Sequence, residues 1–165
     1  MPRMNNPIIK SVASALLIVL GMIGSTSSAE EIQLRKSLTT AERRCLAEIL
    51  RTGYWRIMPE FHRKMLDAAV VARPDLKENG QREYIFTIAD FEFCGTAGCS
   101  LLIGEVGKDG SCHEIYDGSG SGDAMTVLRK RDHGYRRLYT PCELRFDGHE
   151  YQQVHNECPT INVQR

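Results

Sequence analysis

The sequence predicts an α+β protein: two N-terminal helices packed on an antiparallel meander sheet of roughly five to seven strands, held together by disulfides. Three observations support this prediction. Apolar residues recur at helical spacing before residue 74, short strand-like runs separated by turns follow from residue 83, and there are six cysteines. Turns of a few residues join antiparallel neighbours, whereas a parallel pair needs a longer crossover. With no internal repeat and no linker, residues 30–165 are expected to form a single domain.

Residues 1–29 have the features of a cleaved secretory signal peptide. Arg3 and Lys10 form a basic start, residues 12–23 are almost wholly apolar, and small residues lead to a cleavage point after Ala29. The apolar run is shorter than the roughly 20 residues of a membrane-spanning helix, so we expect no transmembrane segment after cleavage. An uncleaved N-terminal anchor is the alternative. The predicted location is the periplasm or the exterior of the cell.

The charge balance argues against nucleic acid as a partner. Residues 1–29 hold two of the 21 basic residues and none of the 21 acidic ones, so residues 30–165 carry a formal net charge of −2. Nucleic-acid binders instead concentrate basic residues on one face. One basic cluster occurs at residues 129–131 and 136–137. It is interpreted either as an anionic-surface site or as a charged sheet edge that discourages aggregation.

The helical half begins with a capping box at Thr39 and Glu42, in which each side chain accepts from the other residue's amide. Apolar residues at helical spacing predict the first helix over residues 40–50, which Gly53 ends. A second helix is expected to start near Pro59 and to stop at Pro74. Its apolar face would consist of Phe61, Met65, Ala68, Ala69 and Ala72.

The strand half is centred on residues 83–106, where two β-type runs flank a short cysteine loop. Residues 84–89 are apolar on both faces, which predicts a central strand. Later strands are expected at residues 99–106, 112–116, 125–128, 135–139, 142–146 and 151–154. The last two would pair across Asp147-Gly148, a strong hairpin signal.

All six cysteines follow residue 29, and an exported protein with an even number of cysteines is expected to form disulfides. Cys94 and Cys99 are predicted to pair, because glycines at 95 and 98 let so short a loop close. Spacing does not select the other pairs. We expect Cys112–Cys142, joining two strand regions, and Cys45–Cys158, tying the helical half to the tail.

No metal and no other cofactor is predicted. The cysteines lack the Cys-x-x-Cys spacing of zinc sites. Residues 117–123, Asp-Gly-Ser-Gly-Ser-Gly-Asp, have oxygen side chains at alternate positions, as in a calcium loop. Only two of these are carboxylates, and the glutamate that ends a calcium loop is missing. We expect a flexible link instead.

No catalytic residue is predicted either. The chain has no Gly-x-Ser-x-Gly elbow, and no cysteine is expected to be free for a Cys–His pair. Glu92, Glu105 and Glu114 could form a carboxylate pair across adjacent strands, as glycoside hydrolases require, but acids on strands are usually solvated. The single tryptophan, Trp55, is expected to fill the core rather than to mark a ligand surface.

Two motifs resemble a group of small exported proteins of Gram-negative bacteria. The motifs are Phe93-Cys-Gly-Thr-Ala-Gly-Cys99 and Cys142-Glu-Leu-Arg-Phe-Asp-Gly-His-Glu-Tyr151. The group shares a Cys-Gly-x-x-Gly-Cys loop and a late Cys-x-x-x-Phe-Asp-Gly-x-x-Tyr hairpin. The resemblance covers residues 84–151 and implies a periplasmic location and a sheet, but supplies no catalytic residues.

A looser resemblance is to periplasmic inhibitors of vertebrate-type lysozyme, which also present a Cys-x4-Cys loop from a sheet. Their loops carry a histidine and a basic residue for insertion into the lysozyme cleft. Here the four positions are Gly95, Thr96, Ala97 and Gly98. The chain therefore departs from that pattern at the residues that carry the inhibition.

The predicted function is a non-catalytic periplasmic binding or interaction module. Its candidate site is the tip of the cysteine loop, Gly95, Thr96, Ala97 and Gly98, presented to a protein or an envelope polymer. The alternative is a small cell-envelope hydrolase whose acids and histidine (Glu105, Glu114 and His113) are gathered by the fold. A deep pocket holding two of those side chains would favour the hydrolase, and a flat surface around the loop would favour the binding module.

Overall fold

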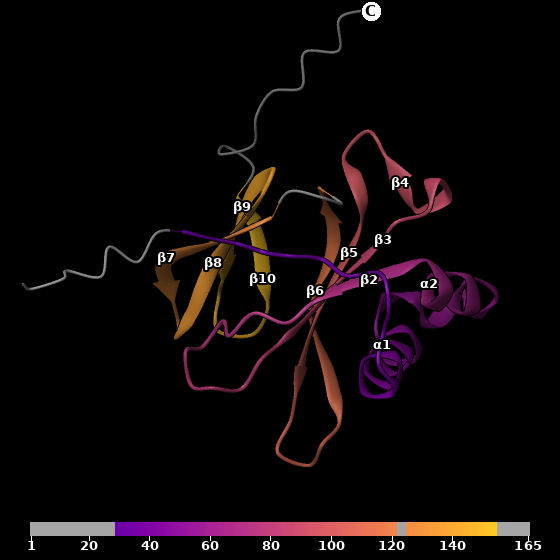
Figure 1. Ribbon diagram of the computed structural model, residues 1–165, viewed down its shortest axis with the longest axis horizontal. Helices are drawn as coiled ribbons and strands as arrows, with labels where there is room; N and C mark the ends of the chain where they lie inside the picture. Colours follow the sequence, from indigo (N-terminus) through magenta and orange to yellow (C-terminus); the bar gives the residue numbers. More distant parts are fainter. Residues whose placement is uncertain (1–28, 122–124, 155–165) are drawn as a thin grey trace, which may run out of the picture.

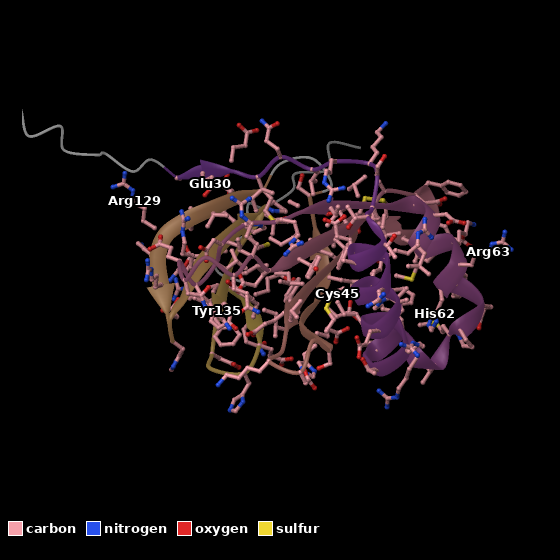
Figure 2. All side chains as sticks on the ribbon, turned by 60° about the horizontal axis from the view of Figure 1, so that its bottom comes forward. Glu30, Cys45, His62, Arg63, Arg129 and Tyr135 are labelled. Atoms are coloured by element: carbon pink, nitrogen blue, oxygen red, sulfur yellow. A yellow bond between two sulfur atoms is a disulfide. The ribbon has the colours of Figure 1, made fainter. Side chains whose placement is uncertain are left out.

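A computed structural model of the protein describes residues 29–121 and 125–154, and these form three layers (Figure 1). Two helices lie on one face of a central sheet, and a second, outer sheet covers its other face. The central sheet comprises β2 (Ala69–Ala72), β3 (Tyr84–Ile88), β4 (Cys94–Gly95), β5 (Gly98–Val106) and β6 (Cys112–Gly120). The outer sheet comprises β1 (Glu30–Glu31), β7 (Thr126–Asp132), β8 (Tyr135–Thr140), β9 (Cys142–Phe146) and β10 (Tyr151–Val154).

The α+β class is confirmed, with sheet predominating, but the prediction of one meander sheet is wrong. Strands pair antiparallel throughout, and β7 to β10 follow one another as a meander. The central sheet has the order β2-β3-β5, with β4 and β6 both paired to β5. Residues of β3 are buried on both faces, as expected for a central strand. Two short helices cover only one of those faces, so the remaining strands form a second sheet on the other.

The first helix, α1 (Thr40–Thr52), forms where its capping box predicts it. The Glu42 amide donates to Thr39 Oγ1 at 3.3 Å, and the Thr39 amide donates to Glu42 Oε2 at 2.7 Å. The chain then makes two 3₁₀ turns, η1 (Tyr54–Ile57) and η2 (Pro59–Phe61). Among the described residues, no helix is long and apolar enough to span a membrane.

The second helix is much shorter than predicted. Helix α2 (His62–Ala68) stops well before Pro74, and residues 69–72 form β2 instead. Ala69 and Val71 face the helical layer while Ala72 faces the outer sheet, an alternation that only a strand gives. Pairing with the fully buried strand β3, from Ala69↔Ile88 to Ala72↔Ile85, outweighs the helical spacing of the alanines.

The disulfides differ in part from those predicted. Cys94 and Cys99 are bonded as expected, but Cys45 pairs with Cys112, so the predicted pairs Cys112–Cys142 and Cys45–Cys158 are wrong. Cys45 on α1 and Cys112 at the start of β6 both lie in the helix-facing core, with Cα atoms 5.1 Å apart. Cys142 is disulfide-bonded too, and Cys158 lies outside the described residues.

Two further predictions fall partly outside the described residues. Of the predicted signal segment, only Ala29 is described. The expected flexible link at 117–123 is wrong for its first half, because residues 117–120 belong to β6 and pair with β5 from Asp117↔Leu102 to Gly120↔Cys99. Asp123, the other carboxylate of the calcium alternative, is not among the described residues.

Candidate functional site

The cysteine loop is a closed β-hairpin at the end of the central sheet. Cys94 pairs with Cys99 and Gly95 with Gly98, so the disulfide joins directly opposed residues (the label β4 marks this hairpin in Figure 1). Gly98 has φ +109°, and a Cβ there would lie 2.3 Å from the carbonyl oxygen of Gly120. Only glycine fits this position. The hairpin is therefore held firmly against the end of β6.

The predicted tip residues are accessible. Gly95, Thr96 and Ala97 are exposed, and Gly98 is half-buried. Their side chains are small, so the tip offers backbone groups and one hydroxyl rather than a large contact area. A binding surface centred here needs larger side chains nearby.

Phe91 supplies such a side chain, and the sequence analysis missed it. Residues 91–93 form a 3₁₀ turn, η3 (Phe91–Phe93), immediately before the hairpin. Asp90 caps the turn by accepting from the Glu92 amide at 3.0 Å. Phe93 is only 8% exposed, whereas Phe91 is 87% exposed. The turn thus buries one ring and points the other at solvent.

Turn η3 rests on the aromatic residues of η1 and η2. The ring of Phe93 makes edge contacts with Trp55 at 6.0 Å and with Phe61 at 5.8 Å between centroids. Trp55 packs against the helix-facing core, in agreement with its predicted core role. Its neighbours Tyr54 and Ile57 are exposed by 60% and 65%. We call the exposed side chains of Tyr54, Ile57 and Phe91 the aromatic rim.

Two acidic residues of β6 lie beside η1. The register passes from Ile103↔Tyr116 to Gly104↔Glu114, so Ile115 is an extra residue, a β-bulge. Residues three apart in a regular strand face opposite sides, but a bulge between them puts both on one side. Glu114 and Asp117 consequently both face the helical layer.

Glu114 lies tightly against the end of α1. A Cβ at Gly53 would stand 2.1 Å from Glu114 Oε2, so a side chain there would push this carboxyl group aside. Burial raises the pKa of Glu114 to about 7, and the negative charges of Asp117 and Glu150 add to the rise. The carbonyl end of a helix also disfavours a nearby negative charge.

Asp117 has a similar environment next to Trp55. Burial raises the pKa of Asp117 to about 6, and the indole N–H of Trp55 opposes part of that rise. Among the described residues, Glu114 Oε2, Asp117 Oδ2 and Trp55 Nε1 are buried and none of them makes a hydrogen bond of normal geometry, so the indole N–H acts on Asp117 only through a longer contact. Tyr54 and Asp117 line a shallow hollow of about 280 Å³ beside the pair.

The structure separates the acids that the sequence proposed as partners. Glu92 forms an ion pair with Lys64, and Glu105 accepts hydrogen bonds from Lys77 and from the Tyr135 hydroxyl. Glu105 and His113 are cross-strand neighbours, and Tyr135, the partner of Glu105, belongs to the outer-sheet core. Glu105 and His113 thus lie on the face of the central sheet opposite Glu114.

The basic cluster is largely paired. Arg131 contacts Glu78, and Arg136 lies 3.4 Å from Glu30. Arg137 makes ion pairs with Asp132 at 2.5 Å and with Glu143 at 2.8 Å. Within the part of the chain that the structure describes, no three His, Cys, Asp or Glu side chains are grouped so that they could hold a metal ion.

Comparison with known proteins finds no family model, no curated protein and no solved structure that matches this chain. The resemblance to small exported Gram-negative proteins stays a prediction.

Proposed function

We propose that this protein is a non-catalytic periplasmic binding module that recognises a protein or an envelope polymer through the cysteine-loop tip and the aromatic rim. Phe91 carries the proposal. A phenylalanine side chain that is 87% exposed gives up the free energy of burying a large ring, on the order of 2 kcal/mol. Aromatic side chains that fill a partner's pocket are typical anchors of binding surfaces.

The rigidity of its support strengthens this proposal. Asp90 caps η3, the Phe93 carbonyl accepts from Ser100 Oγ at 3.3 Å, and the disulfide closes the hairpin that follows. A side chain already held in place loses less conformational entropy when it binds. The shallow shape of the nearby hollow also suits a surface contact better than an enclosed active site.

One observation favours the alternative, a small envelope hydrolase. The pKa values of Glu114 and Asp117 are raised to about 7 and about 6, in the range that suits general acid catalysis. However, Glu114 Oε2 and Asp117 Oδ2 are buried, and Glu105 and His113 face the other way. Turnover of an envelope substrate that disappears in Glu114→Gln would establish the hydrolase and overturn the binding module.

The direct test places a photo-crosslinking amino acid at position 91 of the oxidised protein and exposes it to periplasmic extract. A single stoichiometric partner is expected. Phe91→Ala and the double variant Cys94→Ser/Cys99→Ser should each weaken its binding at least tenfold. Tyr139→Ala is the matched control, because Tyr139 is also exposed, by 42%, but lies in the outer sheet. Equal binding by all these variants would contradict the proposed surface.

A further inference from the structure

We propose that Glu114 and Asp117 form a proton-dependent latch between the helical layer and the central sheet. When protonated, the two side chains hold the end of α1 and the turn η1 in place, and when ionised they loosen both. The latch would regulate the aromatic rim, and this part of the proposal rests on the proposed function.

The latch depends first on where the bulge puts the two carboxyl groups. Because Ile115 is an extra residue, both groups point from one strand into the same narrow space below α1 and η1. The Glu114 carboxyl group occupies the space that a Cβ at Gly53 would take, so that group is packed directly against the helix end. Asp117 lies next to Trp55, whose indole N–H is near enough to lower the pKa of that carboxyl group.

Nearby charges do not compensate for ionisation. Among the described residues, neither carboxyl group forms an ion pair with a lysine, an arginine or a histidine. From α1, Glu48 brings a further carboxylate that accepts from the Cys112 amide at 3.0 Å, and Arg51 donates to the Ala47 carbonyl on the exposed side. From η1, Arg56 donates to the Gly53 carbonyl at 3.3 Å.

The remaining elements around the pair add one titratable ring and one negative charge. From α2, His62 Nε2 lies 2.9 Å from the Trp55 carbonyl oxygen. From the turn between β9 and β10, Glu150 adds a negative potential at Glu114. Opposite on β5, Leu102 and Gly104 carry no charge. His113 on β6 faces away, toward Ser111 Oγ at 2.8 Å.

Two ionised carboxylates in this space would repel each other, Glu150 and the carbonyl end of α1. When the contact is formed, each carboxyl group holds its proton at pH values at which a loosened, hydrated carboxyl group releases it. Raising the pH therefore shifts the equilibrium toward the loosened state, by up to about tenfold per pH unit, between about 4.5 and about 7 for Glu114 and between about 3.8 and about 6 for Asp117.

Loosening would spread from the latch to the aromatic rim. Turn η1 carries Tyr54 and Ile57, and its Trp55 ring supports Phe93 in the turn that presents Phe91. A mobile η1 would leave Phe91 without fixed support. We expect partner binding to be stronger at pH 5 than at pH 8.

Trp55 is the single tryptophan of the chain, so its fluorescence reports on the latch without any partner. Emission of the full, oxidised protein from pH 4.5 to 8.5 should move to longer wavelength with a midpoint between pH 6 and 7. The double variant Glu114→Gln/Asp117→Asn should keep the short-wavelength emission throughout. His62→Gln is the control for the nearby ring, and it should keep the transition.

Flat emission of the unaltered protein, or a transition lost only in His62→Gln, would overturn the latch. A second measurement does not need the variants to fold: the ¹³C carboxyl titration of Glu114 in the unaltered protein. A midpoint above pH 6 supports the latch, and an ordinary midpoint near 4.5 overturns it. A transition in Trp55 with binding that does not depend on pH would keep the latch and contradict its control of the rim, whereas absence of any partner would contradict the proposed function alone.

Discussion

Glu105 and Glu114 stand on neighbouring strands of the central sheet, both only partly exposed, but they face opposite layers. Burial works to raise the pKa of Glu105, yet hydrogen bonds from Lys77 and Tyr135 outweigh it and lower the pKa. Burial also raises the pKa of Glu114, and there the neighbouring charges are negative, so the pKa reaches about 7. Identical carboxyl groups thus have opposite effects on stability, because one face supplies donors and the other does not.

The test with the largest expected effect removes the disulfide Cys45–Cys112, which lies on the same face of the central sheet as Glu114. Cys45–Cys112 joins residues 67 apart, and closing so long a loop restricts the unfolded chain strongly. Cys45→Ala/Cys112→Ala should lower the free energy of unfolding by about 3 to 4 kcal/mol, measured by urea denaturation. The control is Cys94→Ser/Cys99→Ser, whose bond spans five residues and should cost less. Equal losses of unfolding free energy in the two double variants would contradict a larger contribution of Cys45–Cys112 to the stability of the helix-facing core.

The second test removes the carboxylate of the Glu105 face. Glu105→Gln leaves Lys77 without its ion-pair partner and should lower the free energy of unfolding at pH 7 by about 2 kcal/mol. A lowered pKa means that this stabilisation is present above about pH 4.5 and is lost as the pH falls through the folded-state value. The difference between variant and parent should therefore shrink as the pH falls below 4.5 and vanish once Glu105 is protonated in the folded protein. A gain in stability at pH 7 would contradict the role assigned to the pair.

The smallest expected effect has the opposite sign. Glu114→Gln should raise the free energy of unfolding at pH 8 by about 1 to 2 kcal/mol, because the amide carries no charge to bury. A raised pKa means that the parent's stability from this group is complete below about pH 4.5 and falls until about pH 7. The gain should accordingly disappear at pH 4.5. A variant less stable than the parent at pH 8 would show that Glu114 has a stabilising partner in solution.

Local signals predicted those parts of the fold in which neighbouring residues decide the structure. The capping box at Thr39 and Glu42 placed the start of α1, and the glycines beside Cys94 and Cys99 indicated their bond. Strand β2 could not be predicted in this way. Its alanines fit a helix equally well, and pairing with β3, distant in sequence, decided the outcome. The second sheet was missed for a similar reason, since apolar residues on both faces do not say what covers them.

In the candidate site, too, some residues could be identified from local sequence and others could not. The loop tip was identified from its own residues, whereas Phe91 and Phe93 both alternate with acidic residues, and nothing in that pattern says which ring is buried. Asp90 before them was a usable signal, because aspartate often caps a short turn. The Glu114–Asp117 pair had a weaker one: Ile115 and Tyr116, two adjacent apolar residues, break the alternation where the bulge lies.

The bulge at Ile115 changes which residues of β6 face the helices. Before Ile115, alternate residues from Cys112 face the helices, and after it the alternation restarts one position later, at Asp117. If the same residues paired without the bulge, every side chain after Ile115 would turn to the other face of the sheet. Asp117 would then face the apolar core beneath the outer sheet. The position of one extra residue, more than the identity of any side chain, keeps this carboxyl group out of that core.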